Sequence, residues 1–159
     1  MNRIALFCAL SIAFLAPLGH ANVELTTTVQ RVVAAIGDDG QVVRRLEDVA
    51  SVTADDVLHY TIRYTNNGVD VVEEGSVVIT CPIPQDTVYL AGTAKGAGAT
   101  VTYSVDDGES FAPISELSEP AESGDGSAGG APTTIRWVIT PELAPGQAGE
   151  VSFDVRMRI

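Results

Sequence analysis

The sequence is poor in the residue types that build disulfide frameworks and transition-metal centres. Its 159 residues include two cysteines, two histidines and two methionines. This scarcity excludes a small scaffold held by several disulfides, and it argues against zinc or copper, which need several sulfur or imidazole ligands. A chain of this length must instead be stabilised by a single hydrophobic core.

Positive charge is also scarce. Nine lysine and arginine residues face 21 aspartate and glutamate residues, and Lys95 is the only lysine, so the formal net charge is −12. Such a surface repels nucleic acid and anionic lipid, and we expect neither as a partner. It suits solubility, a cation or a basic partner.

Long apolar runs are absent except at the N-terminus. Residues 4–18 are almost entirely apolar, Arg3 precedes them, and the small residues Gly19 and Ala21 follow. This pattern predicts a signal peptide over residues 1–21. The run is short for a membrane span of about 20 residues, which favours cleavage over an uncleaved anchor.

Cleavage after Ala21 would define the rest of the organisation. Residues 22–159 would form one domain that is exported to the periplasm, the cell surface or the medium, with no direct membrane insertion after cleavage. Cys8 lies inside the apolar run and not at its end, so we expect no lipidation. Cys81 would then be the only cysteine left, buried at a strand end, with an intermolecular disulfide as the alternative.

The dominant period in the rest of the chain is two, which indicates β-strands. In residues 57–64, Leu58, Tyr60 and Ile62 share one face, and residues 151–159 alternate in the same way. Turn signals rich in glycine, proline and asparagine separate the segments, and no segment has a clear helical period. The predicted strands are residues 23–36, 41–49, 57–64, 71–81, 87–94, 100–105, 133–140 and 151–159. This spacing predicts an all-β fold, an antiparallel β-sandwich of about 7–9 strands.

One acidic segment interrupts the strand pattern. Residues 115–132 contain Glu116, Glu119, Glu122 and Asp125 in a run rich in glycine, serine and alanine. Little in this stretch has an apolar side chain to bury, so we interpret it as a mobile loop inside the domain.

Several motifs, in their order along the chain, resemble the conserved repeat domain of prokaryotic surface proteins known as domain of unknown function eleven. They include a Tyr-Thr-Ile strand followed by an Asn-x-Gly turn, and their order is more specific than any one motif. The matching stretches are residues 55–68, 77–84, 89–94, 143–146 and 151–153, with Trp137 between them. The resemblance implies an immunoglobulin-like sandwich that serves as a building block of adhesins and envelope proteins. Asp55 stands where that family usually has glycine, and Cys81 where it often has aspartate.

The most chemistry-like stretch is residues 104–111, in which Asp106, Asp107 and Glu109 surround Gly108. The spacing resembles the Asp-box, a structural hairpin motif. We therefore interpret the stretch as a turn, in which Asp106 binds backbone N–H groups, Gly108 adopts a positive φ and Phe111 packs inward. The alternative is a calcium site formed by Asp106, Asp107 and Glu109 with acids from other loops.

Catalytic groups are few in this sequence, and the resemblance supplies none. His59 is the only histidine after residue 21, and it lies on the outward face of its predicted strand, where we expect it to be solvated. Nothing in the sequence pairs His59 with a nucleophile, so we do not expect an enzyme.

The sequence therefore favours a structural or adhesive envelope protein that binds a protein partner, or itself, through edge strands. Residues 23–36 are the candidate edge because they are long and rich in threonine and valine. The alternative is a soluble module that binds a cation or ligand with acidic loops at one end of the sandwich.

Overall fold

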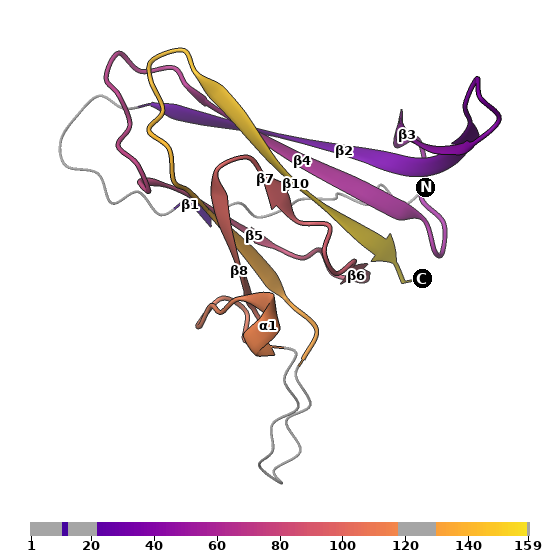
Figure 1. Cartoon of the computed structure of the whole chain (residues 1–159). Helices are drawn as coiled ribbons and strands as arrows, with labels where there is room; N and C mark the ends of the chain where they lie inside the picture. The colour runs from indigo at the N-terminus through magenta and orange to yellow at the C-terminus, as the bar shows by residue number, and fades with distance from the viewer. Residues whose placement is uncertain (1–10, 13–21, 118–129, 159) are drawn as a thin grey trace, which may run out of the picture.

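A computed structural model of the chain describes residues 11–12, 22–117 and 130–158. Two antiparallel sheets pack face to face, so the predicted all-β sandwich is confirmed (Figure 1). This architecture is consistent with an immunoglobulin-like arrangement. In Figure 1 the larger sheet lies above the smaller one, and the C-terminus lies at the same end as the turn between β2 and β3.

The larger sheet has six strands in the order β3-β2-β4-β10-β6, and β7 also pairs with β10. Its strands are β2 (Val23–Ile36), β3 (Val42–Asp48), β4 (Val57–Asn66), β6 (Thr87–Tyr89), β7 (Lys95–Gly96) and β10 (Ala148–Met157). The central strand β4 pairs with β2 on one side and with β10 on the other. The first and last segments of the domain therefore lie on either side of its most regular strand.

The smaller sheet has four strands in the order β1-β5-β9-β8. They are β1 (Ser11–Ile12), β5 (Val77–Pro82), β9 (Thr134–Ile139) and β8 (Ala99–Ser104). A single helical turn, α1 (Ile114–Leu117), follows β8. It begins where the acidic loop was expected, and residues 118–129 of that loop lie outside the described residues.

The core forms between the sheets from alternate side chains. Leu58, Tyr60 and Ile62 of β4 are fully buried, which confirms the predicted inward face of that strand. Phe153 of β10 stacks on Tyr60 with ring centroids 5.0 Å apart, and Trp137 of β9 lies 5.8 Å from Phe153. This aromatic cluster joins the two sheets at the centre of the sandwich.

Asn66 organises the loop that leaves β4. Its side chain is fully buried, and its amide nitrogen donates to the carbonyl oxygens of Asp70 (2.8 Å) and Leu143 (2.9 Å). Its side-chain oxygen accepts the N–H of Gly68 at 2.9 Å. One asparagine thus satisfies three backbone groups, which explains physically why this turn has an Asn-x-Gly sequence.

Most expected strands match the structure within two residues at each end, and β2 matches at both ends. Two were predicted too long. Residues 71–76 form a loop held by a bridge between Val72 and Leu143, and β6 ends at Tyr89. Turn residues and local hydrogen bonds make β5 begin later, and β6 end earlier, than the β-branched composition of these segments suggests.

Of residues 1–21, the structure describes Ser11–Ile12, which pair with Thr80 and Ile79 of β5. Residues 1–10 and 13–21 lie outside the described residues, and cleavage after Ala21 stays a prediction. Cys81 is fully buried near the end of β5, as expected, and it is disulfide-bonded in this structure of the whole chain. The sequence expectation of a single cysteine concerned the cleaved chain and is not tested by this bond.

Candidate functional site

The stretch 104–111 forms a hairpin turn at the end of β8, and a bridge between Tyr103 and Ala112 closes it. Asp106 accepts the hydroxyls of Ser104 and Ser110, each at 2.5 Å, and the N–H of Ser110 at 2.9 Å. The Ser104 hydroxyl oxygen in turn accepts the N–H of Gly108 at 2.8 Å. The carboxylate therefore fixes the turn from inside, in the arrangement that the sequence predicted.

The backbone of this turn explains its glycine. Gly108 has a φ of 95°, and the preceding Asp107 also has a positive φ, of 59°. Glycine adopts this region without a steric penalty, and aspartate tolerates it better than most residues. Phe111 differs from the prediction, because it lies outside the core cluster, with the guanidinium carbon of Arg136 3.5 Å from its ring centroid. A cation thus covers this ring.

Hydrogen bonding in the turn also sets its electrostatics. The Ser104 hydroxyl, with the hydroxyl and N–H of Ser110, holds the pKa of the Asp106 carboxyl well below its usual range. The carboxylate stays ionised because three donors face it. Asp106 is thus already engaged by its own turn.

The expected calcium ligands do not converge in the part of the chain that the structure describes. Across residues 22–117 and 130–158, no group of three or more histidine, cysteine, aspartate or glutamate side chains is arranged to hold a metal ion. The N–H of Asp107 binds the Thr133 hydroxyl at 3.0 Å, which ties its backbone to the neighbouring segment. Calcium at Asp106, Asp107 and Glu109 stays a prediction, and a thermal-shift scan with calcium and with chelator would test it.

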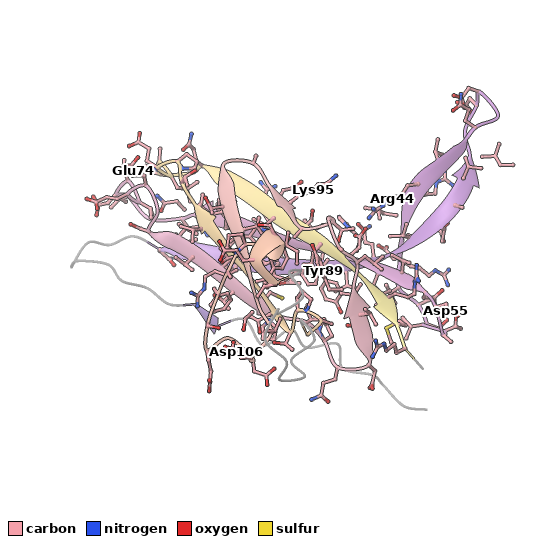
Figure 2. The ribbon with its side chains drawn as sticks, turned by 60° about the horizontal axis from the view of Figure 1, so that its bottom comes forward. Arg44, Asp55, Glu74, Tyr89, Lys95 and Asp106 are labelled. Carbon is pink, nitrogen blue, oxygen red and sulfur yellow. The ribbon has the colours of Figure 1, made fainter. Side chains whose placement is uncertain are left out.

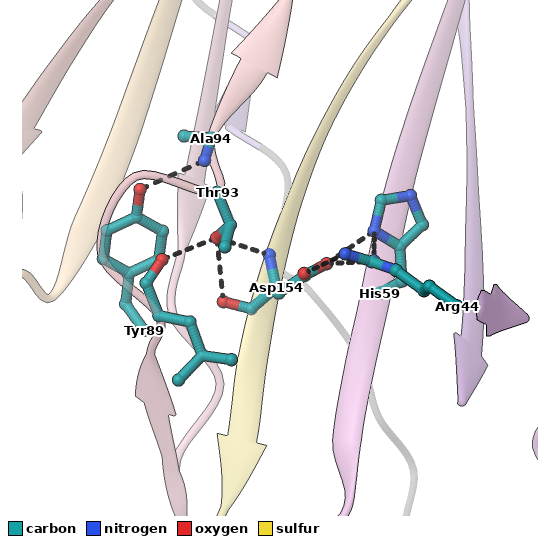
Figure 3. A network of polar contacts seen from close by, with 7 residues as sticks. Arg44, His59, Tyr89, Thr93, Ala94 and Asp154 are labelled. Carbon is teal, nitrogen blue, oxygen red and sulfur yellow. Dashed lines mark hydrogen bonds and ion pairs between the residues drawn. The ribbon is translucent and has the colours of Figure 1, made fainter. Parts of the chain in front are cut away.

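A second polar cluster, which sequence reasoning missed, lies on the outer face of the larger sheet (Figure 3). Asp154 of β10 accepts both terminal nitrogens of Arg44, with Nη1 2.7 Å from Oδ2 and Nη2 2.9 Å from Oδ1. Nδ1 of His59 lies 2.6 Å from the same Oδ1. The prediction of a solvated His59 is wrong, because only 17% of its side chain is exposed.

The proton on His59 can be assigned from its neighbours. A carboxylate only accepts and a guanidinium only donates, so Nδ1 must carry a hydrogen to bond Asp154. Arg44 Nη2 also lies 3.0 Å from this Nδ1, but two donors cannot bond each other. The two nitrogens lie close together because each donates to the same oxygen, Oδ1 of Asp154.

Burial and neighbouring charges shift the pKa of Asp154 in opposite directions. Burial raises the pKa of its carboxyl, but the hydrogen bonds and charges of Arg44 and His59 outweigh burial and lower the pKa below the usual value. On the other side, the backbone N–H of Asp154 donates to the Thr93 hydroxyl at 3.0 Å. Asp154 therefore links the loop after β6 to β4 and β3.

In chemical terms this cluster is an ion-pair network. Within the described part of the chain, the His59 ring bonds Asp154 and lies close to Arg44. The network joins distant strands. Arg44 belongs to β3, and Asp154 belongs to β10, which lies three strands away in the sheet order. The bidentate contact ties β3 back onto the face of the sheet.

That contact anchors an exposed hairpin. β2 pairs with β4 only as far as Val32, but it pairs with β3 as far as Ile36. Residues 33–45, which we call the arm, thus extend past the end of the β4 ladder, and Figure 2 shows this hairpin projecting from the sandwich. Three of its apolar side chains are exposed: Ile36 by 79%, Val42 by 75% and Val43 by 42%.

Comparisons of the chain with protein-family models, curated proteins and solved structures found no match. The resemblance to the surface-protein repeat therefore stays an interpretation of the sequence motifs. In the described residues, no helix is both long and apolar enough to span a membrane.

Proposed function

We propose that this chain is an exported, non-catalytic module of the cell envelope that acts by binding another protein, in a structural or adhesive role. The single observation that carries the proposal is the arm. Three large apolar side chains at its end are exposed to water, although a soluble protein gains stability by burying such groups. The register places Ile36 opposite Val42, so these two side chains form one exposed apolar patch, and Val43 lies on the other face of the hairpin. Exposed apolar patches on a rigid element are typical of protein-binding surfaces.

The anchoring of the arm supports this proposal. A free two-stranded hairpin is marginally stable in water, so an apolar hairpin without support would be mobile. Here Arg44 fixes the arm through two short hydrogen bonds to the buried Asp154. An arm held in place loses less conformational entropy when a partner binds. The N-terminal apolar run and the surface-repeat resemblance support export and an envelope location.

Site-specific photo-crosslinking in living cells tests the binding role. A photoreactive residue at Val42 of the arm should give an adduct with a defined protein, to be identified by mass spectrometry. Val69 is the matched control, because it is 79% exposed and lies in the loop after β4, at the opposite end of the sandwich. Equal labelling at both positions, or no adduct at Val42, would overturn a binding role for the arm.

The location needs a separate measurement. We expect the protein recovered from fractionated cells to lie in the envelope or medium and to begin at Asn22. A cytoplasmic protein that retains residues 1–21 would refute export but would leave the binding role of the arm untested.

A further inference from the structure

The outer side of β2 is open along its first half. β2 pairs with β4 over residues 23–32 but with β3 only over residues 30–36. Among the described residues, no strand pairs with the outer side of residues 23–29, which we call the β2 edge. Within residues 23–36, both sides of the strand are thus paired only over residues 30–32.

The backbone groups that this edge presents follow from the alternation of the ladder. The N–H of Asn67 donates to the carbonyl of Asn22, so the even-numbered residues of β2 bond towards β4. The N–H of Gly37 donates to the carbonyl of Gln41, so the odd-numbered residues bond towards β3. The N–H and C=O groups of the odd residues 23, 25, 27 and 29 therefore point outward from the sheet.

Three apolar side chains of this edge are not fully covered. Val23, Leu25 and Val29 are only partly buried against the core cluster. The solvent face of the same segment carries Glu24, Thr26 and Thr28, all exposed. An added strand would satisfy the outward backbone groups and cover the apolar side chains at the same time.

Other edges in the described structure are protected. β3 carries four charged residues among its seven, and β6 and β7 span three and two residues. β5 is covered by β1 as long as residues 1–21 are retained, and β8 is bridged at Tyr103 by Ala112. The β2 edge has one charged residue and no lysine or proline, so it lacks the usual devices that prevent strand pairing.

We propose that the occupant of the β2 edge is the β2 edge of a second copy, paired antiparallel about Thr26. In this register Val23 faces the partner's Val29, Leu25 faces the partner's Thr27, and Thr26 faces itself. The odd residues become the hydrogen-bonded pairs, which gives roughly eight bonds, two for each of four pairs. Shifting the register by one residue would place core-facing side chains opposite solvent-facing ones.

Charge and symmetry are compatible with this dimer. Glu24 lies opposite the partner's Thr28, so no like charges face each other, and its carboxylate already accepts the Asn67 amide at 2.5 Å. A two-fold axis through Thr26 makes the interface isologous and closed, so the product is a dimer and not a filament. The inference deepens the proposed function by naming one partner, on a surface that adjoins the arm.

A charge swap at the two-fold axis tests the register. We expect the chain, expressed from its full sequence and purified as the cell processes it, to be a dimer by light scattering. Thr26→Lys and Thr26→Glu each place like charges opposite one another and should weaken dimerisation about tenfold. Mixing the two variants should restore a heterodimer. Thr100→Lys, an exposed position of β8, is the control and should dimerise as the unaltered chain does.

A disulfide trap gives a second readout. In a non-hydrogen-bonded antiparallel pair the Cα atoms lie about 4.5 Å apart, within disulfide range. Thr26→Cys should therefore form a covalent dimer under oxidation, whereas Thr28→Cys, opposite the partner's Glu24, should not. A monomeric unaltered chain, a Thr26→Lys variant that dimerises normally, or equal trapping at both positions would overturn the inference.

The same variants separate this inference from the proposed function. The Val42 crosslink is repeated in the Thr26→Lys background. If the adduct with another protein persists while the chain is monomeric, the arm binds a partner and only self-pairing is lost. If a dimer forms through Thr26 but Val42 yields no adduct, self-pairing stands and the proposed role of the arm fails.

Discussion

The centre of the sandwich and the arm are built from the same antiparallel ladder, but their side chains have opposite environments. β4 and β10 bury every second side chain, and Phe153 stacks on Tyr60 between the sheets. In the arm, Ile36 and Val42 are exposed, and the strand β3 is exposed along its whole length. Backbone pairing alone therefore does not fix how stable a β-hairpin is. The centre is stable because it excludes water, and the arm is held by its ladder and by one ion-pair network.

Truncating an aromatic side chain at the centre should give the largest contrast with the arm. Trp137→Ala should lower the free energy of unfolding by about 3–5 kcal/mol, because a fully buried ring is replaced by a cavity. Ile36→Ala on the arm should change it by less than about 0.5 kcal/mol. Urea unfolding followed by circular dichroism measures both, and similar losses would contradict the contrast.

Asn66 tests whether a buried polar group can matter as much as apolar packing. Asn66→Ala should lower the free energy of unfolding by about 2–3 kcal/mol, since one buried carbonyl, one part-buried carbonyl and one part-buried N–H lose their partner. Asn67→Ala is the matched control, because that side chain bonds only an exposed Glu24 in the structure. An equal effect of the two substitutions would show that burial of Asn66 is unimportant.

The link between centre and arm is broken by Asp154→Asn. We expect a loss of about 1–2 kcal/mol, because the charge that Arg44 and His59 share disappears, while the exposure of Arg44 limits the effect. Hydrogen exchange of the β3 amides should accelerate more than that of β4. Glu150→Gln, an exposed position of the same strand, should leave both unchanged. Unaltered β3 exchange in Asp154→Asn would remove the anchoring role.

Acid should reproduce this loss without a mutation. The folded-state pKa of Asp154 is lowered, so its contribution is present above the unfolded carboxyl pKa of about 4 and is lost as pH falls through the folded value. The stability difference between the unaltered chain and Asp154→Asn should therefore narrow as pH falls below about 4 in urea titrations. A stability difference that stays constant down to acid pH would contradict the lowered pKa of Asp154.

A small effect is expected from one hydroxyl inside the centre. The hydroxyl of Tyr60 is buried and lacks a hydrogen-bond partner within the described structure, and burial raises its pKa. Tyr60→Phe should therefore leave the melting temperature unchanged or raise it, by up to about 1 kcal/mol in stability. Tyr103→Phe, which removes a hydroxyl bonded to Tyr89 at 3.1 Å, should lower it. A clear loss in Tyr60→Phe would indicate a hidden partner.

Much of the fold was readable because local patterns and tertiary burial agree. The alternation of Leu58, Tyr60 and Ile62 fixed both a strand and its inward face, and the acidic turn at Asp106 was predicted from its own spacing. The cluster of Arg44, His59 and Asp154 was not readable, since its members lie up to 110 residues apart and Asp154 occupies a position that alternation assigns to solvent. Their convergence depends on strand order, which no local pattern encodes.

The sequence by itself determined the all-β class, the approximate positions of most strands, the alternating faces and the internal hydrogen bonds of local turns. These features depend on residues close in the chain, whose spacing sets which groups can meet. Tertiary structure alone decided which strands are neighbours, which half of β2 is an open edge, and that the arm is tied to the sheet through Asp154. Those outcomes depend on contacts between distant segments, and burial of Asp154 beneath Arg44 exists only after β3 and β10 share one sheet.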